Sequence, residues 1–200
     1  MPANFGQRPP PPAGGALLGL GTAGAGSGAL ASVAMYLRPG YPAGIATTVA
    51  DLLILMGIIG LGRRERSTDW HPVAICALAN VIAATAALVL PRVGVGPVSD
   101  FFGSLSWLAD GAAYGALGWV LLRRRTNIHM GLGIVTGTAC AMRAGLALLL
   151  AGLQPLEITL GLPDFLLLHL WQVASVAVGG TMAVFFIIAR STQPAHSVHR

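Results

Sequence analysis

Lysine is absent from this chain of 200 residues, so its 12 Lys or Arg positions are all arginines. Without a lysine amine the protein cannot form a Schiff base, which excludes a rhodopsin-type pigment and any lysine nucleophile. Charged residues are also scarce, at 10% of the chain against about 25% in a soluble domain, while 54% of the residues are hydrophobic. The chain has too little polar surface to face water on all sides.

Cysteine and the common catalytic motifs are equally sparse. Cys76 and Cys140 lie in different hydrophobic segments and form no CxxC pair, which argues against a thiol oxidoreductase motif and against a cysteine zinc site. The sequence also contains no GxSxG, HExxH, GxxxxGKS/T or DDxxD pattern. The usual motifs for ester hydrolysis, zinc proteolysis, phosphate binding and magnesium diphosphate binding are therefore missing.

The five histidines do not form a recognisable metal or haem site. His71 and His129 begin hydrophobic segments, and His196 and His199 lie in a polar tail with too few other ligands for a metal. His169 lies inside a hydrophobic segment, but a b-type haem needs a second histidine at the same depth on another helix, and the sequence has none. We therefore expect neither a metal nor a cofactor.

The hydrophobic residues form six segments, each long enough to cross a membrane, because about 20 residues at a rise of ~1.5 Å span a ~30 Å hydrocarbon core. The sequence therefore predicts an all-α, polytopic transmembrane bundle of six helices that forms a single domain over residues 13–190. It is preceded by a disordered, Pro-rich cytoplasmic arm at 1–12 and followed by a cytoplasmic tail at 191–200. The predicted helices are 13–37, 42–62, 71–91, 101–122, 128–152 and 164–189.

Arginine is concentrated in alternate connections between these segments. Arg63, Arg64 and Arg66 follow the second segment, and residues 123–125 follow the fourth. Short cytoplasmic loops retain arginine, so this alternation predicts a multi-pass protein of the cell membrane with both termini in the cytoplasm. Membrane orientation also explains the net charge of +5 better than nucleic-acid binding does, because the arginines do not form a stripe on one face. We expect the lipid bilayer as a partner and no nucleic acid.

Several polar side chains lie within the hydrophobic segments. An ionisable group in the bilayer costs roughly 2.5–3.5 kcal/mol on insertion scales, so such groups face the interior of a bundle and mark functional sites. Asp51, Asp110 and Arg143 belong to three different segments, and Trp107 lies one helical turn from Asp110 on the same face. The predicted substrate-binding layer comprises Asp51, Asn80, Trp107, Asp110, Arg143, His169 and Gln172.

Two interpretations of the charged residues remain open in the sequence. Arg143 can neutralise one carboxylate through a bidentate pair, which leaves a second, desolvated acid to hold a proton and to couple proton binding to solute binding. A polar or anionic solute could instead displace one aspartate from Arg143. Alternatively, Arg143 simply locks two helices together, with Asn80 and Gln172 as hydrogen-bond partners between helices.

Three classes of function are compatible with these residues. We favour a small proton-linked solute carrier or a substrate-binding membrane component. The second class is a membrane enzyme that acts on a lipid, quinone or isoprenoid with a protonated Asp110 or Asp51 as general acid. In such an enzyme, Trp107, Tyr114 and Trp171 would supply aromatic walls. Either class implies a small-molecule or lipid-like ligand.

The third class is a non-catalytic subunit of a membrane complex. Glycines at a spacing of four residues permit close approach of transmembrane helices, and the pairs Gly111/Gly115 and Gly133/Gly137 have this spacing. These faces would serve a homo-oligomer or a contact with other membrane subunits.

Overall fold

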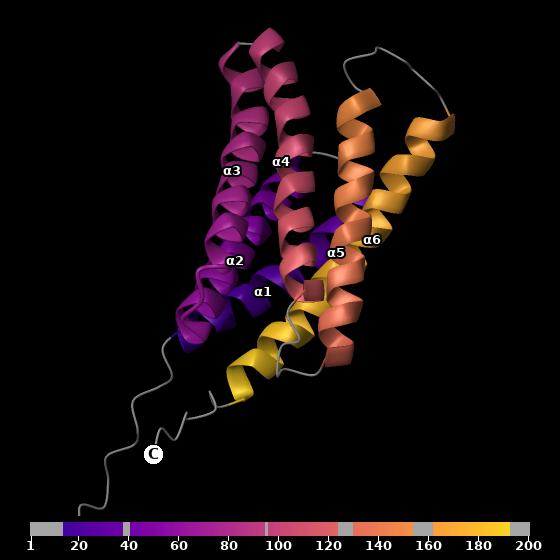
Figure 1. Ribbon diagram of the computed structural model, residues 1–200. Helices are drawn as coiled ribbons and strands as arrows, with labels where there is room; N and C mark the ends of the chain where they lie inside the picture. The colour runs from indigo at the N-terminus through magenta and orange to yellow at the C-terminus, as the bar shows by residue number, and fades with distance from the viewer. Residues whose placement is uncertain (1–13, 38–40, 95, 124–129, 154–161, 193–200) are drawn as a thin grey trace, which may run out of the picture.

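Six long helices make up almost all of the computed structural model (Figure 1), which describes residues 14–37, 41–94, 96–123, 130–153 and 162–192. Each helix contains a stretch long and apolar enough to cross a membrane, and the described residues contain no strand. The predicted all-α bundle of six transmembrane helices is therefore confirmed. The helices are α1 (Gly15–Leu37), α2 (Tyr41–Glu65), α3 (Trp70–Val89), α4 (Gly96–Arg123), α5 (Met130–Leu153) and α6 (Leu162–Ser191), with a short 3-10 helix, η1 (Leu90–Val93), after α3.

The helix ends differ from the predicted segments where polar residues continue a helix beyond the apolar stretch. The α2 helix includes Arg63, Arg64 and Glu65, and α4 begins at Gly96 instead of residue 101. Hydropathy locates the hydrocarbon core, whereas backbone hydrogen bonding continues into the interfacial layer. The predicted arm at 1–12 lies outside the described residues, as does most of the predicted tail at 191–200.

The connection between α3 and α4 follows from its residues. Pro91 lies in η1, and proline cannot continue a regular helix because it lacks a backbone N–H. Gly94 then adopts a φ of 81°, a left-handed conformation that glycine takes without the steric cost of a Cβ. The chain thereby reverses and enters α4.

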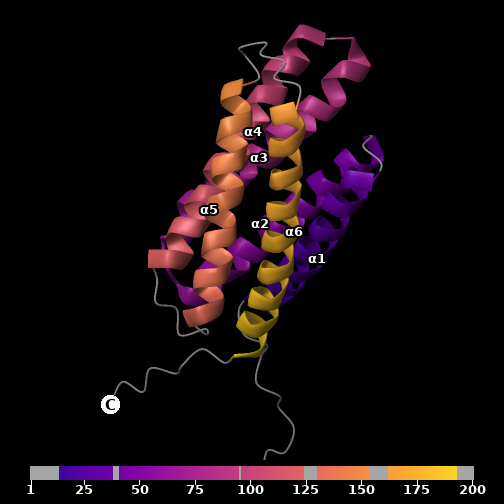
Figure 2. The same cartoon turned by 90° about the vertical axis from the view of Figure 1, so that its right-hand side faces the viewer.

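The helices form a closed ring. Each helix packs against its neighbour in the sequence, and α6 packs against α1; the views in Figures 1 and 2 show the same order around the bundle. The beginning of α1 and the end of α6 lie at the same end of the molecule, together with the end of α2 and the beginning of α3. This end is called the terminal end below. That it faces the cytoplasm stays a prediction.

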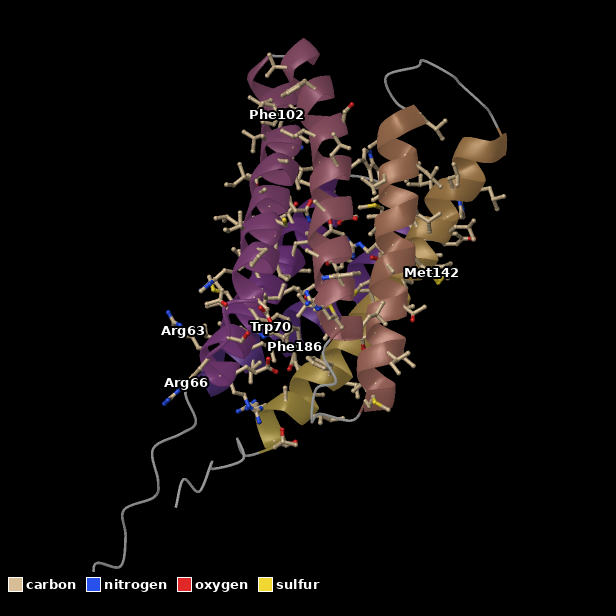
Figure 3. All side chains as sticks on the ribbon, viewed as in Figure 1. Arg63, Arg66, Trp70, Phe102, Met142 and Phe186 are labelled. Atoms are coloured by element: carbon tan, nitrogen blue, oxygen red, sulfur yellow. The ribbon has the colours of Figure 1, made fainter. Side chains whose placement is uncertain are left out.

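Large side chains fill the half of the ring at the terminal end. Trp70 of α3 and Phe185 and Phe186 of α6 are 1% exposed or less, and the Trp70 indole N–H donates a hydrogen bond of 2.7 Å to Glu65. Figure 3 shows Trp70 and Phe186 inside this half. They lie near Arg63, in the last turn of α2, and Arg66, which directly follows α2.

The outward faces of the helices are apolar. Leu30, Ile75 and Trp119 are 72%, 68% and 65% exposed, and Met142 points away from the bundle in Figure 3. Such faces are stable in lipid and unstable in water. They support a multi-pass integral membrane protein; which membrane holds it stays a prediction.

Glycines bring neighbouring helices together inside the ring. The predicted pairs Gly111/Gly115 and Gly133/Gly137 lie on α4 and α5, and a Cβ on Gly111 would come within 2.8 Å of Leu148, and one on Gly137 within 2.8 Å of Leu122. These two glycines therefore serve the α4–α5 contact within the chain. Association with other subunits stays a prediction.

The α1–α2 contact is closer still, and it gives the first testable prediction. A Cβ on Gly21 would lie 2.5 Å from the Cα of Gly57, so an added methyl group forces the two backbones apart. We expect Gly21→Ala to lower the free energy of unfolding by about 1–3 kcal/mol, as overpacking usually does. Reversible unfolding of the purified protein in mixed micelles measures this change.

Gly26→Ala is the matched control on the same helix, because a Cβ at position 26 meets no described atom within 4 Å. It should leave the free energy of unfolding unchanged or raise it slightly through better helix propensity. Equal destabilisation by both variants would contradict the close crossing of α1 and α2.

Candidate functional site

The ring encloses a cavity of about 250 Å³ in the half away from the terminal end. All six helices contribute residues to its wall, and Ile54, Tyr114 and Val178 on that wall also belong to the hydrophobic core cluster of the bundle. Asp51 of α2, Asp110 of α4 and Arg143 of α5 line this cavity together. Five residues of the predicted polar layer, Asp51, Asn80, Trp107, Asp110 and Arg143, thus lie on the wall of one cavity.

Arg143 and Asp110 form a buried, bidentate ion pair between α5 and α4. The Arg143 Nη2 donates to Asp110 Oδ1 at 2.6 Å, and its Nε donates to Oδ2 at 3.2 Å. The indole N–H of Trp171 on α6 donates to the same Oδ2 at 3.2 Å. Two parallel charge-assisted bonds are the strongest arrangement available to this pair. They join α4 and α5, and the Trp171 bond adds α6.

Tyr114 links this ion pair to the second acid. Its ring lies under the Arg143 guanidinium, 3.7 Å from the central carbon to the ring centroid, a distance typical of a cation–π contact. Its hydroxyl donates to Asp51 Oδ1 at 3.1 Å. One side chain on α4 therefore contacts both the arginine on α5 and the carboxylate on α2.

Asp51 has neutral partners. Asn80 of α3 donates to Asp51 Oδ2 at 3.2 Å, so each carboxylate oxygen accepts one hydrogen bond, the other coming from Tyr114. Among the described residues no basic side chain forms an ion pair with Asp51. The positive charge of Arg143 attracts the Asp51 carboxylate from beyond contact distance. Asp51 is half-buried, whereas Asp110 is 5% exposed. The cavity wall therefore carries one carboxylate that is not neutralised by a contacting cation.

Aromatic side chains form part of the wall next to the ion pair. Trp107 of α4 and Trp171 of α6 both line the cavity, and their rings meet edge to face with centroids 4.9 Å apart. Trp107 precedes Asp110 by one turn, so the predicted shared face is present. Together with Tyr114, these residues form the aromatic walls that the sequence suggested.

Five hydroxyl groups on the wall were not anticipated. Each donates its proton to a carbonyl oxygen of its own helix, at 2.7–3.0 Å, which leaves lone pairs of the oxygen to accept a further hydrogen bond. Helical spacing could have identified three of them, because they precede Asp51 or Asp110 by three or four residues. The five are Ser32, Thr47, Thr48, Ser106 and Ser175.

His169 and Gln172 are the two predicted site residues that do not appear among the described residues of the cavity wall. The His169 ring packs edge to face against Tyr36 of α1, with centroids 4.8 Å apart. Gln172 is 6% exposed, and its Oε1 has no hydrogen-bond partner in the described part of the chain. A role for either residue in binding stays a prediction.

The described residues contain no group of three or more His, Cys, Asp or Glu side chains placed to hold a metal ion. Comparison of the chain with models of known families, with curated proteins and with solved structures finds no significant match. The chemistry of the cavity wall is therefore the basis for a functional proposal.

Removal of the arginine tests the buried ion pair. Arg143→Gln leaves Asp110 buried without a cation, and breaking such a pair on one side usually costs about 3–5 kcal/mol. We expect a loss of this size in the free energy of unfolding, and partial recovery in the double variant Asp110→Asn/Arg143→Gln, which removes the orphaned charge. Unfolding in mixed micelles measures both variants.

Arg63→Gln is the control, since Arg63 is exposed at the end of α2 and exposed substitutions usually change stability by less than about 0.5 kcal/mol. An effect of Arg143→Gln as small as that of Arg63→Gln would show that the ion pair does not hold α4 and α5 together.

Proposed function

We propose that the protein is a small proton-linked solute carrier or a substrate-binding membrane component, and that Asp51 is the residue at which proton and solute meet. The observation that carries this proposal is a carboxylate without a contacting cation on the wall of a cavity of about 250 Å³. A buried charge without a partner is costly in a membrane, so such groups mark binding sites and proton pathways.

The two aspartates have different roles in this proposal. Arg143 and Trp171 donate three hydrogen bonds to the Asp110 carboxylate, which makes this cluster the rigid base of the site. Asp51 is held only by the neutral donors Asn80 and Tyr114. A proton on Asp51 removes its charge, so proton binding and the binding of a charged or polar solute change each other at one carboxylate.

The shape of the interior supports access from one side. The cavity occupies the half away from the terminal end, and Trp70, Phe185 and Phe186 fill the other half. In the predicted topology the cavity would face the outside of the cell. A binding component can work from this arrangement alone, whereas a carrier must also open the packed half.

The size of the cavity limits the solute. Sites for drug-sized ligands have volumes of about 300–1,000 Å³, and this cavity is slightly smaller. The favoured ligand is therefore a small solute instead of a whole lipid molecule.

A membrane enzyme is the second candidate, favoured by one observation. Trp107, Tyr114 and Trp171 surround the acids on the cavity wall, an arrangement that could stabilise a cationic intermediate of an isoprenoid or quinone reaction. Product analysis of lipids from membranes with and without this protein tests it. Turnover whose pH profile survives both Asp110→Asn and Asp51→Asn would exclude the aspartates as general acids.

Proton exchange on solute addition tests the favoured proposal. Purified protein in weakly buffered detergent, and in vesicles that contain a pH-sensitive dye, is given small cationic, neutral and anionic solutes. We expect at least one solute to change the pH in the wild type. The change should disappear in Asp51→Asn, because asparagine cannot bind or release the proton.

Asp69→Asn is the matched control, since Asp69 is exposed next to the start of α3 and is not among the described residues of the cavity wall. Transfer of protons across the vesicle membrane identifies a carrier, and a response only in detergent identifies a binding component. No response in the wild type, or an equal response in Asp51→Asn, contradicts the proposal.

A further inference from the structure

The cavity wall has a net negative charge when Asp51 is ionised. The described wall contains one cation, Arg143, which is neutralised by its bidentate contact with Asp110, so the charge of Asp51 is left over. The guanidinium is further occupied by the Tyr114 ring at 3.7 Å. An anionic solute that took over these two contacts would displace Asp110 from Arg143 and leave that carboxylate buried without a partner, which is strongly unfavourable. An anion on the remaining guanidinium N–H groups would bring a second negative charge next to that of Asp51.

Five hydroxyl groups on the wall are left as acceptors, beside the N–H donors of Trp107, Asn80 and Arg143. The hydroxyl protons of Ser32, Thr47, Thr48, Ser106 and Ser175 are donated to carbonyl groups of their own helices. The donors Asn80 and Tyr114 are already directed at Asp51. The wall therefore offers a charged carboxylate and several oxygen lone pairs, which fits a solute that carries N–H donors.

The rest of the wall is apolar and aromatic. Trp107, Ile54, Leu88, Leu168 and Val178 all line the cavity. Sites of this kind bury the hydrocarbon part of a ligand while a few polar groups fix its orientation, and an aromatic face also attracts a nearby cation. A solute with a short hydrocarbon or aromatic body satisfies this part of the wall.

We propose that the solute is a small organic amine bound as a monocation, with its ammonium group against Asp51 and its apolar part against Trp107. This inference rests on the proposed function and adds the chemical class of the ligand. The ammonium group replaces the proton as the charge that neutralises Asp51. The amine and the proton therefore compete for the same carboxylate, and amine binding releases a proton wherever Asp51 is protonated.

Competition fixes the direction of the pH dependence. The titratable or charged groups that share the described wall with Asp51 are Tyr114 and Asp110 of α4 and Arg143 of α5; α1, α3 and α6 contribute none to that wall. A primary amine keeps its positive charge at any pH well below ~10. A fall in pH within this range therefore changes the charge of the Asp51 carboxylate and not that of the amine. Amine binding is strongest where Asp51 is ionised and is lost as Asp51 becomes protonated.

Three probes of similar size and different charge provide the test: phenethylamine as the cation, 2-phenylethanol as the neutral analogue and phenylacetate as the anion. Calorimetric titration of the full-length protein in lipid nanodiscs measures their affinities. We expect phenethylamine to bind at least about tenfold more tightly than either analogue, since a hydrogen bond to a charged group contributes at least that factor. Its affinity should fall as the pH is lowered.

Asp51→Asn should reduce the affinity for phenethylamine by about tenfold or more and remove its pH dependence, while Asp69→Asn should leave both unchanged. If Asp51→Asn fails to fold, the pH dependence of phenethylamine binding to the wild type still tests whether the amine and the proton compete. Phenethylamine binding that is absent, that is independent of pH, or that matches the binding of 2-phenylethanol overturns the amine proposal.

Failure of the amine proposal is distinguishable from failure of the proposed function. Tighter binding of 2-phenylethanol or phenylacetate that depends on Asp51 overturns the amine class and keeps the cavity as a proton-linked solute site. Loss of Asp51-dependent binding and proton exchange for all three probes contradicts both.

Discussion

The buried ion pair between Arg143 and Asp110 determines what the rest of the cavity wall can do. A charged side chain inside a bilayer is tolerated when it is paired and its remaining donors and acceptors are occupied. Here Arg143 is paired with Asp110 through two hydrogen bonds, Asp110 accepts a third from Trp171, and the face of Tyr114 lies against the guanidinium. Because the only arginine on the described wall is bound to Asp110, Asp51 is left without a contacting cation. The structural clamp and the proposed binding site are thus parts of one arrangement.

The interior of the ring is divided between packing and function. Helices gain little from hydrophobic burial when lipid is as apolar as the core, so their association depends on close packing and on hydrogen bonds between helices. The terminal end has close packing through Gly21, Gly57 and the aromatic core around Trp70. The other half is held by the polar contacts of Asp51 and Asp110, which leave a cavity between them. This division stabilises the bundle at one end and leaves room for a solute at the other.

The six helices could be predicted from the sequence, because the length and hydropathy of a membrane-spanning segment depend on the bilayer alone. The sequence also placed Asp51, Asp110 and Arg143 in one layer. It could not decide which aspartate contacts Arg143, since that depends on the rotation of each helix about its axis. Hydrophobic periodicity usually reports this rotation, but in a membrane the lipid-facing and core-facing sides are both apolar. The contact of Tyr114 with both Asp51 and Arg143 could therefore not be predicted from the sequence.

The same limit explains the positions of His169 and Gln172. The residues of α6 on the cavity wall include Trp171, Ser175 and Val178, which recur at the spacing of one helix face. His169 follows Leu168 of the wall and Gln172 follows Trp171, and each step turns a helix of 3.6 residues per turn by about 100°. Both side chains therefore point away from the wall, and His169 contacts Tyr36 of α1. The level of these side chains along the bundle could be predicted from the sequence, whereas the direction in which each points around its helix could not.

The central proposal is that Asp51 exchanges its proton for the charge of a bound amine. Infrared difference spectroscopy tests it most directly, because the protonated carboxyl group has a carbonyl band that the carboxylate lacks. At acidic pH, addition of phenethylamine should remove a carboxyl band from the wild-type spectrum, and this change should be absent from Asp51→Asn. A wild-type spectrum whose carboxyl bands do not respond to phenethylamine, or an equal response in Asp51→Asn, would contradict the account.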